Sequence, residues 1–275
     1  SGNAITCTAN FGTVNFNDDI TDVDLIIPPG IVIGPLNLSG TVARFRIRGS
    51  TVGTHSGGEI NDGLTTFFSG TDVILDGIDF SLNSASNADC ILFQQNDMAR
   101  VAIVNTRMRS LAGGLLGSKI RHLVVAGNNW LTAEAESPPR GEGDKGWCFR
   151  LGAHASLPHP VVFFRNQLYA KAQPTFQCIR LDETLSSTSV RYGWIAENDI
   201  MNLVEGQLIS TFDYSGSANV RWNDVWGLRN NNYSTVDCQY DGRVIIDYAR
   251  FTQNNFFSTT SQADMDTDAG SCPAT

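Results

Sequence analysis

Charged residues, lysine above all, are scarce in this chain, and it has no long hydrophobic run. Only 17% of its 275 residues are charged, and the formal net charge is −9. An acidic chain without a basic stripe cannot displace the counterions of a nucleic acid, so we expect no nucleic-acid partner. No stretch approaches the roughly 18 consecutive apolar residues that cross a bilayer, so we expect no membrane insertion.

The chain also lacks the cysteine and histidine spacings of zinc sites. Its six cysteines form no CxxC pair and have no histidine at metal-binding distance along the sequence. An even number of cysteines in an acidic, lysine-poor chain favours disulfides, and with them a secreted or cell-surface protein, extracellular or periplasmic. Six buried free thiols are the alternative.

Helical periodicity is absent too, and a β-rich unit recurs instead. Each copy has a β-rich run, a turn with a small residue or asparagine, and a large apolar anchor: Phe45–Val52, Val73–Phe80, Val101–Met108, Leu123–Trp130, Val161–Leu168, Gly193–Ile200, Ala218–Val225 and Val244–Phe251. Successive anchors lie 22 to 38 residues apart, near the lower end of solenoid repeats. Alternation predicts one inward stack, formed by Ile47, Leu75, Ile103, Val125, Phe163, Ile195 and Ile246.

A second set of strands is predicted between these runs: Ala88–Gln94, Gly114–Lys119, Trp147–Leu151, Phe176–Asp182, Gln207–Phe212 and Val236–Tyr240. Strand, turn, strand, loop, strand, loop is the order of a coil that carries three sheets.

Asparagine recurs at one position of the repeat. The second residue before each anchor is Ser50, Ile78, Thr106, Asn128, Asn166, Asn198, Asn223 and Ala249. Asparagine tolerates a left-handed backbone, and stacked amides can hydrogen-bond from coil to coil. Four asparagines in succession therefore predict an asparagine ladder.

These coils, with three short strands each and an asparagine ladder, resemble the pectate-lyase-like right-handed parallel β-helix superfamily over roughly residues 43–257. The resemblance implies an all-β, single-domain right-handed parallel β-helix of about eight coils. Residues 1–42 are then expected to form an N-terminal cap and first coil, and residues 258–275 a C-terminal tail. We find none of the short catalytic signatures of pectate lyases, polygalacturonases, pectin methylesterases or alginate epimerases. The superfamily also contains viral tail spikes and adhesins, so the fold does not settle the function.

In that superfamily the strand called PB1 lines the substrate groove, and the asparagine positions equate PB1 with the second strand set. One motif occurs there twice, as Gly146–Leu151 (GWCFRL) and as Phe176–Asp182 (FQCIRLD). Alternation predicts that Arg150 and Arg180 point outward on adjacent coils, with Lys119 outward on the coil before. Cys148 and Cys178 are predicted to form a disulfide, because their Cα atoms would lie about 4.4–6.8 Å apart. The pairing of the remaining cysteines, Cys7, Cys90, Cys238 and Cys272, stays open.

The outward basic residues suggest uronate chemistry. A polyuronate lyase must neutralise the uronate carboxylate, remove the proton at C5 and protonate the leaving oxygen. Arg150 and Arg180 are predicted to clamp the carboxylate. Lys119 is the candidate base, because neighbouring positive charge would lower its pKa, and His154 competes for that role.

A long insertion, Leu131–Lys145, is expected to overhang these residues, and such loops are often functional. It contributes Glu134, which together with Trp147 completes the predicted substrate contacts. Asp182 and Glu183 are predicted to contact substrate and to hold Ca²⁺, a hard ion that takes oxygen ligands. The alternative is that these stacked charges are only solvated neighbours.

Two further surfaces complete the prediction. The outward residues of the preceding sheet are apolar, namely Ala102, Val104, Val124, Ala126, Val162, Phe164, Trp194 and Ala196, which predicts cover by a terminal segment or by a partner in a homo-oligomer. The polar residues near the asparagine turns, namely Arg107, Arg109, Arg165, Glu197, Asp199 and Asp224, are interpreted as ordinary turn and surface residues.

The leading hypothesis is a secreted carbohydrate-active protein, a lyase that cleaves an acidic, uronate-containing polysaccharide by β-elimination. The alternative is a non-catalytic glycan-binding or adhesion protein, or a tail-spike-like surface protein.

Overall fold

The protein folds as a parallel β-helix. Its structure is a computed structural model. It describes residues 3–19, 21–50, 57–61, 65–81, 89–93, 98–110, 113–117, 120–127, 129–133, 147–151, 159–170, 176–183, 191–202, 206–213, 225–229, 232–235, 243–245, 249–252, 255–258 and 264–266. Side chains are described at 3–19, 21–40, 43–50, 57–61, 72–80, 100–108, 120, 122–127, 129, 162–168 and 194–199. These ranges contain no helix, and hence none that is long and apolar enough to cross a membrane.

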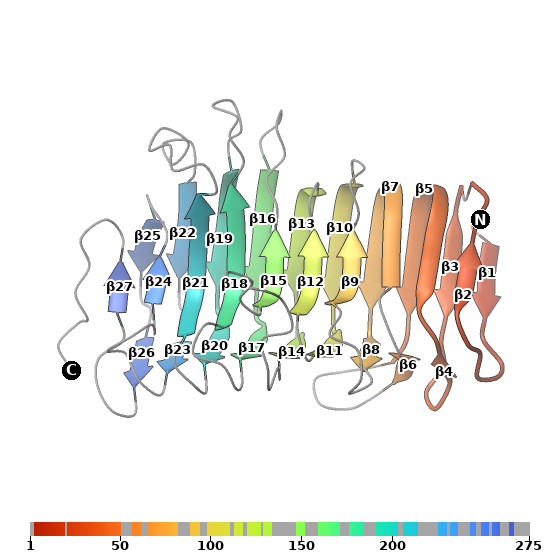
Figure 1. Cartoon of the computed structure of the whole chain (residues 1–275), viewed down its shortest axis with the longest axis horizontal. Coiled ribbons are helices and arrows are strands. Elements are labelled where there is room, and N and C mark those ends of the chain that lie inside the picture. Colours follow the sequence, from red (N-terminus) through yellow and green to blue (C-terminus); the bar gives the residue numbers. More distant parts are fainter. Residues whose placement is uncertain are drawn as a thin grey trace.

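Between the two ends, successive coils contribute strands to three parallel ladders, which run along the long axis of the molecule (Figure 1). Ladder 1, which includes the predicted second strand set, contains β2 (Val14–Phe16), the first parts of β5 (Leu36–Arg48) and β7 (Thr65–Asp76), β9 (Asp89–Phe93), β12 (Gly113–Gly117), β15 (Trp147–Leu151), β18 (Phe176–Glu183), β21 (Gly206–Asp213), β24 (Arg243–Ile245) and β27 (Asp264–Asp266).

Ladder 2 contains β1 (Asn3–Thr6), β3 (Val23–Ile26), the second parts of β5 and β7, β10 (Met98–Val104), β13 (Ile120–Ala126), β16 (His159–Phe164), β19 (Arg191–Ala196), β22 (Val225–Arg229) and β25 (Ala249–Thr252). Ladder 3 contains β4 (Val32–Ile33), β6 (Gly58–Asn61), β8 (Ile78–Ser81), β11 (Arg107–Ser110), β14 (Trp130–Ala133), β17 (Gln167–Ala170), β20 (Asp199–Asn202), β23 (Asn232–Thr235) and β26 (Asn255–Ser258). Because β5 and β7 run through two ladders, ladders 1 and 2 form one sheet, which has 18 strands in the described part of the chain, and ladder 3 forms a sheet that has 9 there.

The hydrophobic core consists of rows, a row being the residues at one register position on successive strands. Six members of the predicted inward stack form one row of ladder 2 and are fully buried: Ile47, Leu75, Ile103, Val125, Phe163 and Ile195. A second buried row, in ladder 3, contains Ile33, Ile60, Phe80, Met108 and Leu168. Each fully buried side chain of this size stabilises the fold by about 1.5–3 kcal/mol relative to an exposed one.

An asparagine ladder follows the core row, at the turn between ladders 2 and 3. Asn129, Asn166 and Asn198 are buried on three successive coils, with at most 1% of their surface exposed. Asn129 donates to Asn166 Oδ1 at 2.8 Å, and Asn166 donates to Asn198 Oδ1 at 2.9 Å. The same amides also donate to core-strand carbonyls, including Ile103 O, Val125 O and Phe163 O. The ladder therefore satisfies polar groups that the turn would otherwise leave buried without partners.

The predicted ladder was wrong by one residue in one coil. The pairing of Arg107 with Trp130, and of Trp130 with Gln167, aligns Thr106, Asn129 and Asn166. The turn through Gly127 and Asn129 is one residue longer than the turns of the neighbouring coils, so the residue level with Met108 and Leu168 is Leu131 and the predicted anchor Trp130 was wrong by one residue. Counting back from Trp130 therefore selected Asn128. Leu131, which was predicted to begin the long insertion, belongs to β14. Asn128 itself lies outside the described residues.

The repeat was also misaligned in the last coils. The strand that continues the core row is Val225–Arg229, in which Leu228 pairs with Ile195, rather than the predicted Ala218–Val225. Val244 and Ile245 belong to ladder 1, where they pair with Ile209 and Ser210. The predicted ladder member Asn223, the predicted core member Ile246 and the predicted strand 236–240 lie outside the described residues. Apolar alternation was present in these segments, but neighbouring strands fix the register, and a short pattern cannot.

Candidate functional site

The two arginines of the recurring motif occupy one row of ladder 1. Trp147 pairs with Gln177, Phe149 with Ile179 and Arg150 with Arg180, so the predicted register of the two strands is confirmed. Cys148 and Cys178 consequently stand opposite each other between these pairs. Adjacent parallel strands lie about 4.8 Å apart, so Arg150 and Arg180 start from neighbouring points on the same side of the backbone.

In this row, the residues on either side of the two arginines are uncharged. Leu116 precedes Arg150 in the row and Ser210 follows Arg180. Lys119 was predicted to share this face, and alternation back from it would add Gly117, but β12 ends at Gly117, which pairs with Leu151. The residue of β12 that shares a row with Arg150 is therefore Leu116, one position earlier than alternation from Lys119 indicates. Lys119, His154 and Glu134 lie outside the described residues.

The predicted calcium ligands lie at the end of β18. Asp182 pairs with Phe212, and Glu183 pairs with Asp213 of the next coil. The register thus brings two carboxylate residues, Glu183 and Asp213, to neighbouring positions, and Asp213 was not among the predicted ligands. Among the residues whose side chains are described, no group of three histidine, cysteine, aspartate or glutamate residues could hold a metal ion. Calcium at this end of the strand stays a prediction.

The outer surface of ladder 2 carries a charged row that was not predicted from the sequence. It runs Asp22, Arg44, Asp72, Arg100 and His122, alternating in sign through its first four members. Arg44 binds the Asp22 carboxylate through two hydrogen bonds, that of Nε being 2.9 Å long, and Arg100 Nη2 donates to Asp72 Oδ2 at 2.7 Å. The sequence signal was present, because each of the last four stands directly before one of the aligned runs.

Hydrogen bonding shifts the acid–base properties of this row. The hydrogen bonds from Arg44, aided by the positive charge of its guanidinium group, lower the pKa of the Asp22 carboxyl group. The same contact, with the nearby charge of Asp72, raises the pKa of Arg44. Both groups are therefore held in their charged forms at neutral pH.

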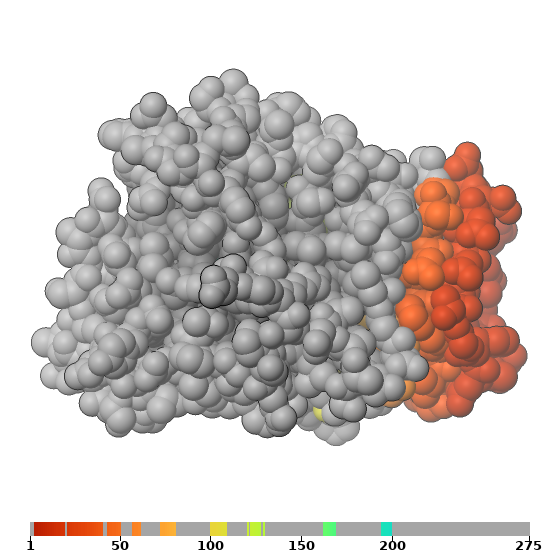
Figure 2. All heavy atoms as spheres, in the orientation of Figure 1, coloured from red at the N-terminus to blue at the C-terminus, as the bar shows by residue number. Residues whose placement is uncertain are grey.

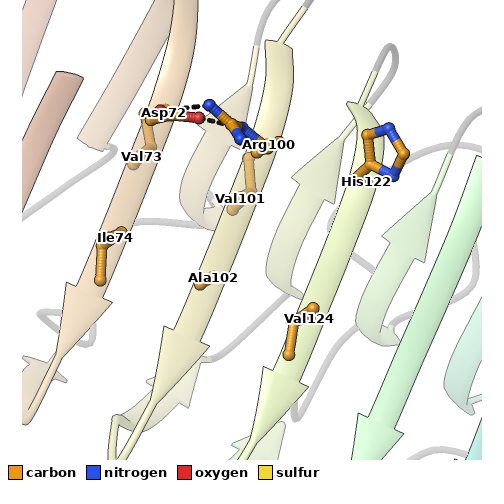
Figure 3. Close-up of a pocket in the computed structure, with 8 residues that line it drawn as sticks. All are labelled: Asp72, Val73, Ile74, Arg100, Val101, Ala102, His122 and Val124. Atoms are coloured by element: carbon orange, nitrogen blue, oxygen red, sulfur yellow. Dashed lines mark hydrogen bonds and ion pairs between the residues drawn. The ribbon is translucent and has the colours of Figure 1, made fainter.

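A hollow of about 340 Å³ lies beside this row, on the outer surface of β7, β10 and β13 (Figure 3). Asp72, Arg100 and His122 form its polar side, and the ion pair between the first two is seen at one end of the close-up. Ile74, Ala102 and Val124 form the apolar row next to them. The hollow thus joins a polar edge to an apolar floor.

The apolar row continues past the hollow through residues that were predicted to face outward, although Ala196, another member of that predicted set, is buried. Val124 pairs with Val162 and Val162 with Trp194. The exposed fraction is 38% for Val124 and 52% for Trp194. Large exposed apolar side chains in one row mark a surface suited to contact with another molecule.

Left-handed backbone recurs where ladder 2 ends. Gly77, Asn105, Gly127, Arg165 and Glu197 all have positive φ, and for the last two φ is 56° and 54°. Arg165 Nε donates to Glu197 Oε2 at 2.7 Å, and the guanidinium group lies 4.8 Å from the centroid of the Phe164 ring. The exposure of this ion pair agrees with its interpretation as a surface feature.

Arg107 does not fit the surface interpretation. Its side chain is only 16% exposed, and it lies 3.7 Å from the Asp79 carboxylate, which is 2% exposed. Asp79 Oδ1 is buried without a hydrogen-bond partner. A buried carboxylate depends on such a counter-ion, so Arg107 stabilises ladder 3.

In comparisons with known proteins, no protein-family model, curated protein or solved structure matches this chain.

Proposed function

We propose that this protein binds an acidic, uronate-containing polysaccharide along ladder 1 and cleaves it by β-elimination. The observation that carries the proposal is the pairing of Arg150 with Arg180 on adjacent strands, between uncharged Leu116 and Ser210. Because adjacent parallel strands lie about 4.8 Å apart, this pairing places two arginines next to each other in an otherwise acidic chain, and we propose that they form a local positive site.

The chemistry requires such a site. In β-elimination a base takes the proton from C5, the electrons of that bond form the C4–C5 double bond, and the C4–O bond breaks while its oxygen accepts a proton. An ionised carboxylate next to C5 opposes the build-up of negative charge there. A guanidinium group that binds both carboxylate oxygens removes much of this penalty. Arg150 and Arg180 are proposed for that role, with Lys119 or His154 as the base.

The test uses a panel of uronate polymers, such as polygalacturonate, alginate and glucuronan, and the ultraviolet absorbance of the unsaturated product. The parent chain should generate absorbance with at least one polymer, and Arg150→Ala and Arg180→Ala should each reduce the rate by about a hundredfold or more. Arg165→Ala is the matched control, because Arg165 is an exposed arginine in the turn that follows ladder 2. Its rate should stay within about twofold of the parent rate. No product with any polymer would refute the lyase.

The second candidate, a non-catalytic glycan-binding protein, is favoured by the exposed apolar row that ends in Trp194. Tight binding of an acidic polymer without product formation would select it. In that case Arg150→Ala should weaken binding of the polymer, and neither the parent chain nor any variant should form product.

A further inference from the structure

The hollow on ladder 2 has two sides of different chemistry. On one side, Arg100 donates from Nε and Nη2 to the two carboxylate oxygens of Asp72. Among the described residues, the Nη1 group of Arg100 has no partner, and the carboxylate oxygens keep further lone pairs. The edge therefore presents hydrogen-bond donors and acceptors next to each other. On the other side, Ile74, Ala102 and Val124 present only carbon.

The charge of this edge selects against ionic ligands. Arg100 is 65% exposed but its charge is compensated by Asp72, and Arg44 lies one strand further along the same row. An anion drawn to Arg100 would meet the Asp72 carboxylate, and a cation drawn to Asp72 would meet two guanidinium groups. A neutral ligand with paired hydroxyl groups avoids both conflicts, because one hydroxyl can donate to Asp72 while its neighbour accepts from Arg100.

The floor requires that the same ligand also has an apolar face. The ring of a sugar meets both demands, since its hydroxyl groups lie at the rim and its C–H bonds point to one face. The volume of about 340 Å³ is at the small end of ligand sites. The apolar row extends from Val124 through Val162 to the half-exposed Trp194, so further rings of a chain would find apolar contact on successive strands.

We propose that this hollow is a binding site for a neutral saccharide, with Asp72 and Arg100 binding adjacent hydroxyl groups and Val124 contacting the ring face. The site lies on ladder 2 and is independent of the function proposed for ladder 1. A neutral section of a glycan, or a second glycan, would be held there.

The experiment uses the whole chain with isotope-labelled histidine, because His122 lines the hollow and reports on it directly. Cellobiose, maltose and N,N′-diacetylchitobiose are titrated in turn, with digalacturonate as the acidic comparison. His122→Gln assigns the signal. At least one neutral disaccharide should shift the His122 resonance in a saturable way, and more tightly than digalacturonate.

The variants then locate the binding. Asp72→Ala and Arg100→Ala should each weaken it by about tenfold or more. Arg48→Ala is the matched control, since Arg48 forms an equivalent pair with Asp24 on the same ladder but does not line the hollow. It should change the affinity less than about twofold. Arg150→Ala should leave the His122 shift unchanged, which separates this site from ladder 1.

Three outcomes would overturn the proposal. They are a His122 signal that no neutral sugar moves, an affinity that neither Asp72→Ala nor Arg100→Ala alters, and stronger binding of digalacturonate. A chain that self-associates, with Trp194→Ala returning it to a monomer while sugar has no effect, would assign the face to a second copy instead.

Discussion

The side-chain amide of Asn166 donates a hydrogen bond of 2.9 Å to Oδ1 of Asn198, one coil further along the helix. The same Oδ1 also accepts from the backbone N–H of Asn166, again at 2.9 Å. Asn198 Oδ1 is thus a buried acceptor for two donors of the previous coil. These two hydrogen bonds hold the turns of successive coils in register.

Replacing Asn166 with leucine should destabilise the fold. The change removes these contacts and leaves Val125 O and Asn198 Oδ1 with fewer donors in a buried turn. We expect a loss of about 1–3 kcal/mol in the free energy of unfolding, measured by urea denaturation. Asn37→Ala is the control, since Asn37 also donates to an asparagine of the neighbouring coil, Asn15, but at an exposed site. It should lose less than about 0.5 kcal/mol, and equal losses would contradict the role of burial.

Two glycine substitutions separate backbone strain from steric overlap. At Gly127, with φ of 75°, a new Cβ would have only Asn105 Oδ1 within 4 Å, at 3.8 Å, so Gly127→Ala should cost about 1–2 kcal/mol through the backbone alone. At Gly49 a Cβ would lie 2.2 Å from the carbonyl oxygen of Gly77. Gly49→Ala should therefore be the more damaging change in thermal unfolding. The reverse order would show that the coils separate easily.

A disulfide between Cys148 and Cys178 is expected from their opposed positions on β15 and β18. Peptide mapping of the unreduced protein by mass spectrometry should find the two residues linked. The thiol of Cys7 is free and buried, and burial raises its pKa, so it should remain unlinked and react slowly with alkylating reagents. Reduction should destabilise the fold by about 2–4 kcal/mol. Two free thiols at 148 and 178 would refute the pairing.

The carboxyl group of Asp22 should titrate below the ordinary aspartate range. Its pKa is lowered by Arg44, so it binds its proton more readily in the unfolded chain than in the folded one. Its contribution to stability is therefore complete above the unfolded pKa of about 3.9 and is lost as the pH falls through the lower folded value. NMR titration should show the Asp22 pKa rising in Arg44→Ala. An unchanged pKa would mean that the pair does not persist in solution.

Much of the fold could be predicted from the sequence because the same apolar alternation recurs in successive coils. Ile103, Val125 and Phe163 were assigned to one core row by alternation, and the structure buries all three. The ladder residue Asn129 was missed because its turn contains one more residue than the neighbouring turns. In the last coils the apolar pattern led to Ala218–Val225 being assigned to the core row, and only strand pairing identifies Leu228 as the partner of Ile195.

The candidate sites differ in how far the sequence could reveal them. The row of Arg150 and Arg180 followed from a motif that occurs twice. The ion pair of Asp72 and Arg100 was visible only as charges that alternate before successive runs, and the hollow beside it depends on side-chain size in three strands. Because residues of three neighbouring strands form the hollow together, the sequence of any one strand cannot predict it.

The most direct test of the central claim is the rate of unsaturated-product formation by the parent chain, Arg150→Ala and Arg180→Ala on the best uronate polymer. Each variant should lose about a hundredfold or more of the rate while its unfolding midpoint stays that of the parent. Full activity in both arginine variants would show that ladder 1 is not the site.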